Sequence, residues 1–383
     1  MKIAFVFDGL GFGGIERVGI DHIKLCTSLC YEVEVYNLAP KHNDLVYQLP
    51  DSVKYYQKKF SAKTCPELYS YGVQKWWWGK YAYALISPLI TVAQKIKKLF
   101  SKKRKYDVAI AFSGHINDIS FVAKKFIKAD KTICWCHGSI IAYLALCDAY
   151  AMLYKKIDKF VTLSSAAQKD IYSGKKYLRN KTINKIYNPT FIGETKIDEA
   201  LVDELKSQYG DFVLMIARIV QGKGHEDAIR TIRCLKEKGL KKNILFLGDG
   251  QLLDACKQIA FEEGVSDLCH FMGAKHNVCD YIAASHINIL MSYYEGLPTV
   301  IIEAMTLGKP CIMTNCDDGE VSGNGRFCKL ISIGDIQAAA DALKDLYENH
   351  DEYFKYSELS LKRAGDFSPD KIKNELKALI SDV

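Results

Sequence analysis

A helix start flanked by two glutamates is the part of this sequence whose residue types most directly indicate chemistry. Glu295 and Glu303 are separated by seven residues, and the segment between them begins Gly-Leu-Pro-Thr. The apolar run at 287–291 predicts a buried strand and 299–307 has helical character, so Glu295 follows the strand and Glu303 lies in the second helical turn. A helix start binds anions through free N–H groups and the positive end of the dipole. Acidic residues that only complement this dipole are the alternative.

Two cations follow another predicted strand in the second half of the chain. The apolar run at 212–217 leads into Arg218 and then Lys223, which lies between two glycines. A guanidinium that forks across oxygens and an ammonium that acts as a point charge can straddle a diphosphate at this spacing. Surface salt bridges are the alternative use of such a pair. The pair therefore indicates a diphosphate site.

A glycine-rich loop near the amino terminus carries a second phosphate-binding pattern. The first predicted strand leads into Gly9, Gly11 and Gly14, which have the GxGxxG spacing of dinucleotide-binding folds, and a helical pattern follows. A nicotinamide-dependent oxidoreductase is thus one interpretation. However, the second strand carries Asn37 near its end, where such enzymes place an acidic ribose ligand. A tight turn without a ligand is a further alternative.

Histidines follow two more predicted strands of the first half. The apolar runs at 107–112 and 132–136 are followed by His115 and His137. Ligand crevices form at the carboxyl ends of parallel strands, so both side chains are candidates for a site, with a plain polar role as the alternative.

Length and composition indicate how these elements are organised. The 383 residues suggest two domains, and 49% apolar with 25% charged residues is ordinary for a soluble globular chain. Alternating strands and helices predict α/β domains with doubly wound sheets. Thirteen cysteines without a CxxC pair favour reduced thiols in a cytosolic compartment over a zinc site. The first residues resemble a strand rather than a signal peptide.

Charge is distributed unevenly along the chain. Residues 1–190 hold 30 Lys/Arg and 14 Asp/Glu, a balance of +16, whereas residues 191–383 have a balance of −9. This asymmetry indicates that the first half faces an anionic surface or ligand.

The segment 73–105 concentrates that positive charge beside aromatic residues. Its apolar part has thirteen residues, which is too short to span a bilayer. Tryptophans and tyrosines beside a basic amphipathic helix favour a surface that lies on anionic lipid, whereas a solvated basic face or an RNA-binding patch are the alternatives. The expected membrane residues are Trp76, Trp77, Trp78, Lys97, Lys98, Lys102, Lys103 and Arg104.

The pattern around the two glutamates resembles a known family. Residues 292–303, followed by Gly308-Lys309-Pro310, are similar to the E-x7-E motif of retaining glycosyltransferases with the GT-B fold, in particular the GT4 family. The Arg218-x4-Lys223-Gly pattern, the end of the glycine loop and the histidine after the strand at 132–136 also resemble that family. The likeness covers nearly the whole chain and is most specific from 217 to 308.

The resemblance implies an α/β protein of GT-B architecture, with two Rossmann-like domains facing across a cleft. It places an acceptor-binding domain at 1–190, which includes the membrane-facing segment, and a nucleotide-sugar-binding domain at 191–365. Residues 366–383 are expected to form a helix that crosses back onto the first domain.

The implied activity is a retaining transfer of a sugar, from UDP-hexose or UDP-N-acetylhexosamine, to a glycan or lipid-linked acceptor in bacterial surface polysaccharide or glycolipid synthesis. No cofactor and no metal are expected, since Asp317 and Asp318 are adjacent rather than spaced as a DxD pair. No residue stands out as a general base, and the leaving phosphate can itself take the acceptor proton.

The resemblance also assigns roles to residues. It makes His137, Arg218, Lys223 and Glu295 catalytic and lets Glu303 bind the ribose hydroxyls. Further donor contacts are expected at Gly13, Gly14, Gly248, Gly296, Leu297, Pro298 and Thr299, and acceptor-side contacts at Glu16, Arg17 and His115.

Two rival functions rest on single segments. A nicotinamide-dependent oxidoreductase rests on the glycine loop alone, and a non-catalytic membrane-surface or RNA-binding protein rests on 73–105 alone. Neither explains the cations and glutamates of the second half. The favoured interpretation expects a cytoplasmic enzyme, peripheral on the inner face of the cell membrane, with no nucleic-acid partner.

Overall fold

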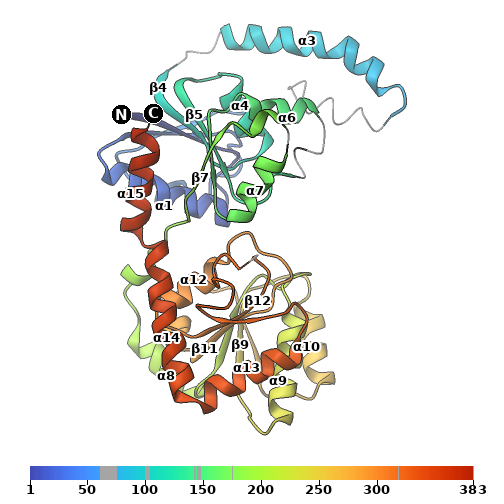
Figure 1. The fold of residues 1–383 in the computed structure, drawn as a ribbon, viewed down its shortest axis with the longest axis vertical. Helices are drawn as coiled ribbons and strands as arrows, with labels where there is room; N and C mark the ends of the chain where they lie inside the picture. The colour runs from blue at the N-terminus through green and yellow to red at the C-terminus, as the bar shows by residue number, and fades with distance from the viewer. Residues whose placement is uncertain are drawn as a thin grey trace. The chain divides into compact units, whose positions relative to one another are not determined.

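The computed structural model describes residues 1–60, 76–99, 104–141, 144, 148–174, 176–317 and 319–382. They form two compact units (Figure 1). Unit 1 consists of Met1–Pro189 with Pro369–Val383, and unit 2 of Thr190–Ser368. Each unit contains one parallel sheet with helices packed against it, so the predicted α/β architecture with two Rossmann-like domains is confirmed.

The sheet of unit 1 has seven strands in the order β3-β2-β1-β4-β5-β6-β7. Its central strands are nearly continuous apolar runs, as expected where helices cover both faces of a parallel sheet. The strands are β1 (Lys2–Phe7), β2 (Glu32–Asn37), β3 (Lys54–Gln57), β4 (Lys105–Ala111), β5 (Lys128–Cys136), β6 (Lys159–Thr162) and β7 (Thr182–Lys185).

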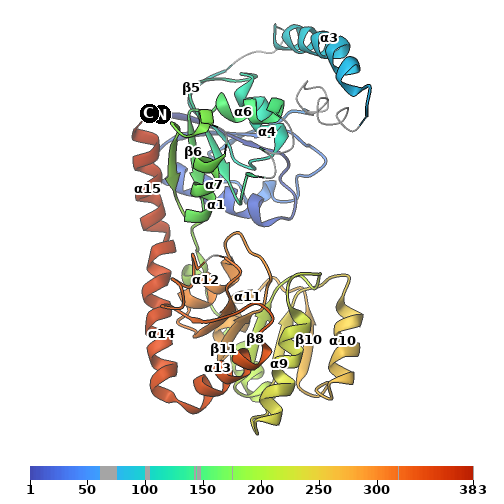
Figure 2. The same ribbon diagram turned by 45° about the vertical axis from the view of Figure 1, so that its right-hand side comes forward.

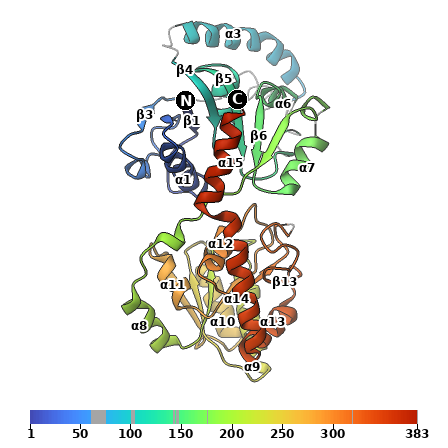
Figure 3. The same cartoon turned by 60° about the vertical axis from the view of Figure 1, so that its left-hand side comes forward.

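The helices of unit 1 include the last helix of the chain. Helix α15 packs on α1, as Figure 3 shows, so the carboxyl-terminal segment is part of this unit. The helices are α1 (Gly14–Ser28), α3 (Gly79–Leu99), α4 (Ile116–Ala123), α6 (Asp148–Lys155), α7 (Ser165–Ser173) and α15 (Pro369–Ser381), with 3-10 turns η1 (Val46–Gln48) and η3 (Lys176–Leu178).

Unit 2 has a six-stranded parallel sheet in the order β10-β9-β8-β11-β12-β13. Helix α9 packs beside α10 and α13 (Figure 2), whereas α11 lies against α8 and α12 against α14 (Figure 3). The strands are β8 (Val213–Ile216), β9 (Ile244–Leu247), β10 (Cys269–Gly273), β11 (Ile287–Leu290), β12 (Cys311–Thr314) and β13 (Lys329–Ile331). The helices are α8 (Glu199–Tyr209), α9 (His225–Glu237), α10 (Leu253–Glu262), α11 (Val278–Ala284), α12 (Thr299–Thr306), α13 (Ile336–Glu348) and α14 (His350–Ala364), with 3-10 turns η4 (Ile192–Glu194) and η5 (Gly365–Phe367).

Each sheet reverses its strand order once. In unit 1 the chain runs outward from β1 through β2 to β3 and then returns to place β4 on the other side of β1. In unit 2 it runs from β8 through β9 to β10 and returns to place β11 beside β8. Ligands of doubly wound folds bind at such points, outside the carboxyl ends of the two central strands. The fold therefore directs attention to the loops after β1 and β4 and after β8 and β11.

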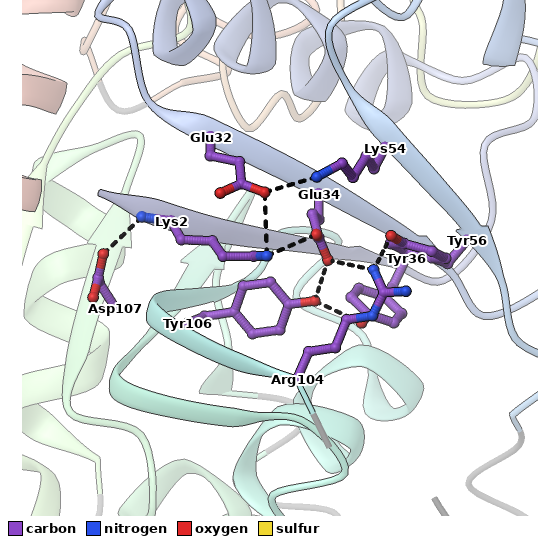
Figure 4. Close-up of polar contacts among 9 residues, drawn as sticks. All are labelled: Lys2, Glu32, Glu34, Tyr36, Lys54, Tyr56, Arg104, Tyr106 and Asp107. Carbon is purple, nitrogen blue, oxygen red and sulfur yellow. Dashed lines mark hydrogen bonds and ion pairs between the residues drawn. The ribbon is translucent and has the colours of Figure 1, made fainter. Parts of the chain in front are cut away.

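A buried carboxylate, that of Glu34, lies toward the amino-terminal ends of the unit 1 strands, at the end of the sheet opposite the switch point (Figure 4). Glu34 is only 1% exposed, and it contacts the Lys2 ammonium at 2.9 Å and the Arg104 guanidinium at 3.1 Å. Burial by itself would raise the pKa of Glu34, but the hydrogen bond from the Tyr106 hydroxyl and the contacts with Lys2 outweigh it and lower the pKa. The network ties Arg104, which directly precedes β4, to the sheet.

Helix α3 occupies most of the predicted membrane-facing segment. It spans 21 residues and contains Pro88, so the expected helix in this segment is present. Among the helices that the structure describes, α3 included, none combines the length and hydropathy needed to cross a membrane. Lys102 and Lys103 lie outside the described residues, as does the side chain of Lys97.

Candidate functional site

The loop after β8 brings Lys223 close to the end of β11. Gly224 has φ +73° and is the residue before α9, and a Cβ there would lie 1.9 Å from the Met291 carbonyl oxygen. Only glycine allows this approach of two backbones. The Tyr293 N–H also donates to the Gly222 carbonyl at 2.9 Å, which joins the two loops on either side of the switch point. The glycines around Lys223 thus position its ammonium.

Lys223 makes an ion pair with the first glutamate of the motif. Its Nζ lies 2.6 Å from Glu295 Oε1, and the Ser292 hydroxyl donates to the same oxygen at 2.8 Å. The Glu295 N–H donates to the Cys316 carbonyl at 2.8 Å, so the loop after β12 holds the backbone of this residue. Both charged side chains are about one-fifth exposed. The sequence-predicted cation and carboxylate are therefore brought together and remain accessible.

Helix α12 begins four residues after Glu295, at Thr299. Pro298 is its N-cap residue and supplies no side-chain hydrogen bond. Its carbonyl accepts the Ile301 N–H at 3.1 Å, so the N–H groups of Thr299 and Val300 are the ones left to other acceptors. Pro298 is buried, Gly296 and Leu297 are half-buried, and Thr299 is exposed. Glu303 is the fifth residue of the helix and half-buried. An anion bound at this helix start would lie on the same segment as both glutamates of the motif.

The turns after β8 and β9 pack by direct backbone contact. A Cβ at Gly248 would lie 2.0 Å from the Ala217 carbonyl oxygen, and one at Gly250 would lie 2.2 Å from that of Ile219. The Ile219 N–H donates to the Asp249 carbonyl at 2.9 Å. Arg218, between these contacts, has an exposed side chain. The structure thus places Arg218 and Gly248 at adjoining strand ends.

The glycine loop of unit 1 leads from β1 into α1. Gly13 is the N-cap of α1, and Glu16 folds back over it so closely that a Cβ on Gly13 would lie 2.1 Å from its carboxylate. Gly14 has no atom near such a position, and Arg17 is exposed. The loop is therefore open at Gly14 and covered by a carboxylate at Gly13, which disfavours a phosphate directly over Gly13.

The two predicted histidines differ in their surroundings. His137 follows β5 and its Nε2 lies 2.8 Å from the Phe112 carbonyl oxygen, while burial lowers its pKa to about 4. His115 is the N-cap residue of α4, and its side chain is 43% exposed. The nearby Asp8 carboxylate, 3.6 Å from His115 Nδ1, raises the pKa of His115. His137 is therefore neutral at pH 7, whereas the pKa of His115 lies above its ordinary value.

Asn37 carries no free polar group for a dinucleotide. Its side-chain amide donates to the His42 carbonyl at 2.9 Å and to the Tyr55 hydroxyl at 3.0 Å, and its oxygen accepts the Ala39 N–H. The residue at the end of β2 thus serves to fold the next loop, which weakens the nicotinamide interpretation.

The cationic membrane candidates are not equivalent. The Arg104 guanidinium contacts Glu34 and the Tyr56 hydroxyl and lies 4.1 Å from the centroid of the Tyr56 ring, so it anchors the chain to the sheet. Lys98 lies over the Phe126 ring. Trp76, Trp77 and Trp78 are all exposed, and the first and last stack at 4.8 Å.

Sequence reasoning missed several residues that build these sites. Ser292 lies in the motif at 292–303, but its residue type alone does not indicate that it binds Glu295. The contact of the Cys316 carbonyl with the Glu295 N–H is likewise not indicated by any sequence spacing. The sequence does offer a signal for Asp8, because it is the first polar residue after the apolar run that forms β1. In the part of the chain that the structure describes, no group of three or more His, Cys, Asp or Glu side chains has the arrangement of a metal site.

Two doubly wound units, one with a cation, a carboxylate and a helix start at its switch point, define a protein of the GT-B class. The family described as Glycosyl transferases group 1 matches residues 210–349. An uncharacterised glycosyltransferase of Haemophilus influenzae is 24% identical over 99% of both chains. The chain is a glycosyltransferase with the GT-B fold.

Further comparisons agree with this assignment. A Campylobacter jejuni relative named as an N-acetylgalactosamine-N,N'-diacetylbacillosaminyl-diphospho-undecaprenol 4-alpha-N-acetylgalactosaminyltransferase is 24% identical over 99% of both chains. The crystal structure of Anabaena HepE in complex with UDP superposes with a TM-score of 0.75 over 100% of both chains, at 18% identity, and supports the fold.

Proposed function

We propose that this glycosyltransferase moves a hexose or N-acetylhexosamine from a UDP-sugar to a glycan or lipid-linked acceptor, with retention at the anomeric carbon and without a metal ion. The product would enter a bacterial surface polysaccharide or glycolipid. The observation that most directly supports this proposal is the Lys223–Glu295 ion pair beside the start of α12, at the switch point of unit 2.

The proposed donor site uses that pair in two ways. Lys223 and Arg218 stabilise the negative charge that develops on the β-phosphate as it leaves, which is usually the largest electrostatic contribution to such a transfer. Glu295 and the N–H groups of Gly296, Leu297 and Thr299 orient the sugar and phosphate, Pro298 fixes the backbone between them, and Glu303 binds the ribose hydroxyls. The UDP in the related Anabaena structure and the diphospho-undecaprenol in the name of the Campylobacter relative support the donor and acceptor classes.

Anionic lipid is the proposed surface for α3. Exposed apolar side chains recur along the helix at Tyr81, Leu85, Leu89, Val92 and Ile96, which is the spacing of one helical face. Lys95 lies exposed beside this face, and the three tryptophans precede the helix. Apolar side chains that enter the interface, with cations that meet anionic headgroups, fit a helix lying in the membrane plane. Such contact would bring unit 1 to a lipid-linked acceptor.

The proposal is tested by a screen of nucleotide sugars. Purified protein is incubated with each UDP-, GDP- and dTDP-sugar, and release of the nucleoside diphosphate is measured with and without lipid-diphosphate-linked acceptors. Release that is fastest with one UDP-sugar and rises with acceptor supports the proposal. Binding of NADH instead of UDP would favour the oxidoreductase, and absence of release with all donors would refute the transfer.

A further inference from the structure

Asp8 and His115 meet at the switch point of unit 1. Asp8 directly follows β1, His115 follows β4, and these two strands are paired up to Val6 and Ala111. The Asp8 N–H donates to the Ser113 hydroxyl at 3.0 Å. Gly114 has φ +66°, and a Cβ there would lie 2.5 Å from the Trp135 carbonyl oxygen, so glycine at this position allows the turn that presents His115.

The two side chains form an oriented carboxylate–imidazole pair. His115 Nδ1 lies 3.6 Å from Asp8 Oδ2, and the Asn117 amide donates to Asp8 Oδ1 at 2.6 Å. The ring–carboxylate distance is longer than a good hydrogen bond, as is common for catalytic pairs before substrate binds. Because Nδ1 faces the carboxylate, Nε2 is the nitrogen left for a substrate. Asp8 is 17% and His115 43% exposed, so the imidazole is the accessible member.

The charges around His115 make it the titrating imidazole of this unit's site. The carboxylates of Asp8, Asp118 and Glu16 raise the pKa of His115, and Asp8 contributes most. The partial burial of the ring opposes them and lowers the pKa. His137, the other imidazole nearby, keeps a pKa of about 4 because it is buried. An imidazole that is oriented by a carboxylate and has a free ring nitrogen is suited to general base catalysis.

We propose that His115 is the general base that takes the proton of the acceptor hydroxyl, and that Asp8 is its positioning residue. This deepens the proposed function and rests on it. The acceptor oxygen forms a bond to the anomeric carbon, and the bond from this carbon to the donor phosphate oxygen breaks. Its electron pair leaves with the nucleoside diphosphate, and the acceptor proton moves to His115 Nε2 and then to water. The alternative route, in which the leaving phosphate takes the proton, predicts different results for the His115 variant.

A titration without substrate tests the pair itself. The imidazole signals are followed by NMR against pH in the full chain, with His115→Gln used to assign the His115 signal. Asp8→Asn removes the carboxylate charge and keeps the side-chain shape, so the pKa of His115 should fall by about one unit or more. An unchanged pKa would show that no pair forms and would overturn the inference whether or not the enzyme is active.

Kinetics test the role. His115→Gln should lower kcat about 100-fold or more, the usual scale of general base catalysis, and abolish the decline of kcat at acid pH. Asp8→Asn should move that decline to lower pH, and both variants should bind UDP as the wild type does. His350→Gln, at an exposed histidine that begins α14, is the matched control and should leave the profile unchanged.

The outcomes separate the two levels of proposal. A His115→Gln enzyme with the wild-type pH profile would mean that the leaving phosphate takes the proton, and only the base assignment fails. A wild-type enzyme that neither binds UDP nor turns over any nucleotide sugar would refute the proposed function, and the base assignment would fall with it.

Discussion

The Lys223 ammonium lies 2.6 Å from the Glu295 carboxylate, across the switch point of unit 2. The ion pair is flanked by the Ser292 hydroxyl, which donates to the same carboxylate oxygen. The cation is thus neutralised by a group on the loop that also begins α12. In the proposed donor site, a diphosphate at this helix start would compete with Glu295 for the ammonium, and the released carboxylate would then be available to the sugar hydroxyls.

The first prediction concerns the donor site. Lys223→Ala and Glu303→Ala should each lower kcat/KM for the UDP-sugar at least tenfold, because one charged contact with a buried ligand contributes about 1.5–3 kcal/mol. Lys355→Ala removes a lysine of a surface ion pair with Glu352 and is the control, with an expected change below twofold. Steady-state kinetics and thermal melts measure both properties. Near-wild-type kinetics in the two site variants would remove these residues from the donor site.

The sequence predicted the strand ends around this site well, for a physical reason. Buried parallel strands are continuous apolar runs, so the first predicted strand appears as β1, and the run at 287–291 agrees with β11 to within one residue. The strand prediction was less accurate where the strands contain polar residues. Strand β5 begins at Lys128 rather than at 132, and the polar edge strands β3 and β7 were not predicted. The lysine–glutamate contact was not predictable, because it depends on how closely Gly224 approaches Met291 in space.

The second prediction tests that close approach. Gly224→Ala should lower the free energy of unfolding by about 2 kcal/mol or more and reduce donor turnover, since a Cβ would collide with the Met291 carbonyl and displace Lys223. Gly239→Ala is the matched control: its φ of +87° is strained in the same way, but no atom lies within 4 Å of the new Cβ. Its cost should be near 1 kcal/mol, with normal turnover. Equal destabilisation of the two variants, measured by urea unfolding, would contradict the packing argument.

A third prediction concerns metals. Turnover should persist in excess EDTA, because the proposed mechanism stabilises the leaving diphosphate with Arg218, Lys223 and helix amides. The measurement is the rate after chelation and gel filtration, with and without added Mn²⁺ or Mg²⁺. A loss of activity that either ion restores would show that a metal carries part of this electrostatic stabilisation.

The fourth prediction concerns the pH dependence of stability. Burial raises the pKa of Asp118 to about 7, far above its usual value, even though the nearby His115 charge lowers it. Because the folded pKa exceeds the unfolded pKa, the native state favours the protonated carboxyl, and stability is lost as pH rises from about 4 to about 7. Asp118→Asn cannot ionise. Its free energy of unfolding relative to wild type should therefore rise by on the order of a few kcal/mol over this range and then level off.

At low pH, wild type and Asp118→Asn should also differ in their free energy of unfolding, and this difference has a separate cause. Both Asp118 oxygens accept backbone bonds, from the Gly114 and Ile119 N–H groups at 2.8 and 3.0 Å, and an asparagine oxygen can keep only one of them. This loss does not vary with pH, so only the slope tests the ionisation. Parallel stability curves for wild type and Asp118→Asn between pH 4 and 8 would show that Asp118 ionises normally in the fold.

The last prediction concerns α3 and lipid. The wild-type protein should float with vesicles that contain phosphatidylglycerol, and Leu85→Gln, Leu89→Gln and Val92→Gln combined should abolish flotation. Each exposed leucine that enters the interface contributes about 1.5–3 kcal/mol, and glutamine preserves helix formation. The cationic contribution should weaken in 1 M salt, where the Debye length is about 3 Å.

The lipid experiment needs two kinds of control. Phe261→Gln with Phe354→Gln removes equally exposed apolar side chains from unit 2 and should float like the wild type. Arg104 is best left unchanged, because its guanidinium is held by Glu34 and the Tyr56 ring, and replacing it would disturb the sheet edge as well as the charge. If the α3 variant floats as well as the wild type, or if the wild type stays with the soluble fraction, α3 is not a lipid-binding helix. The donor-site assignments, which rest on other residues, would remain in force.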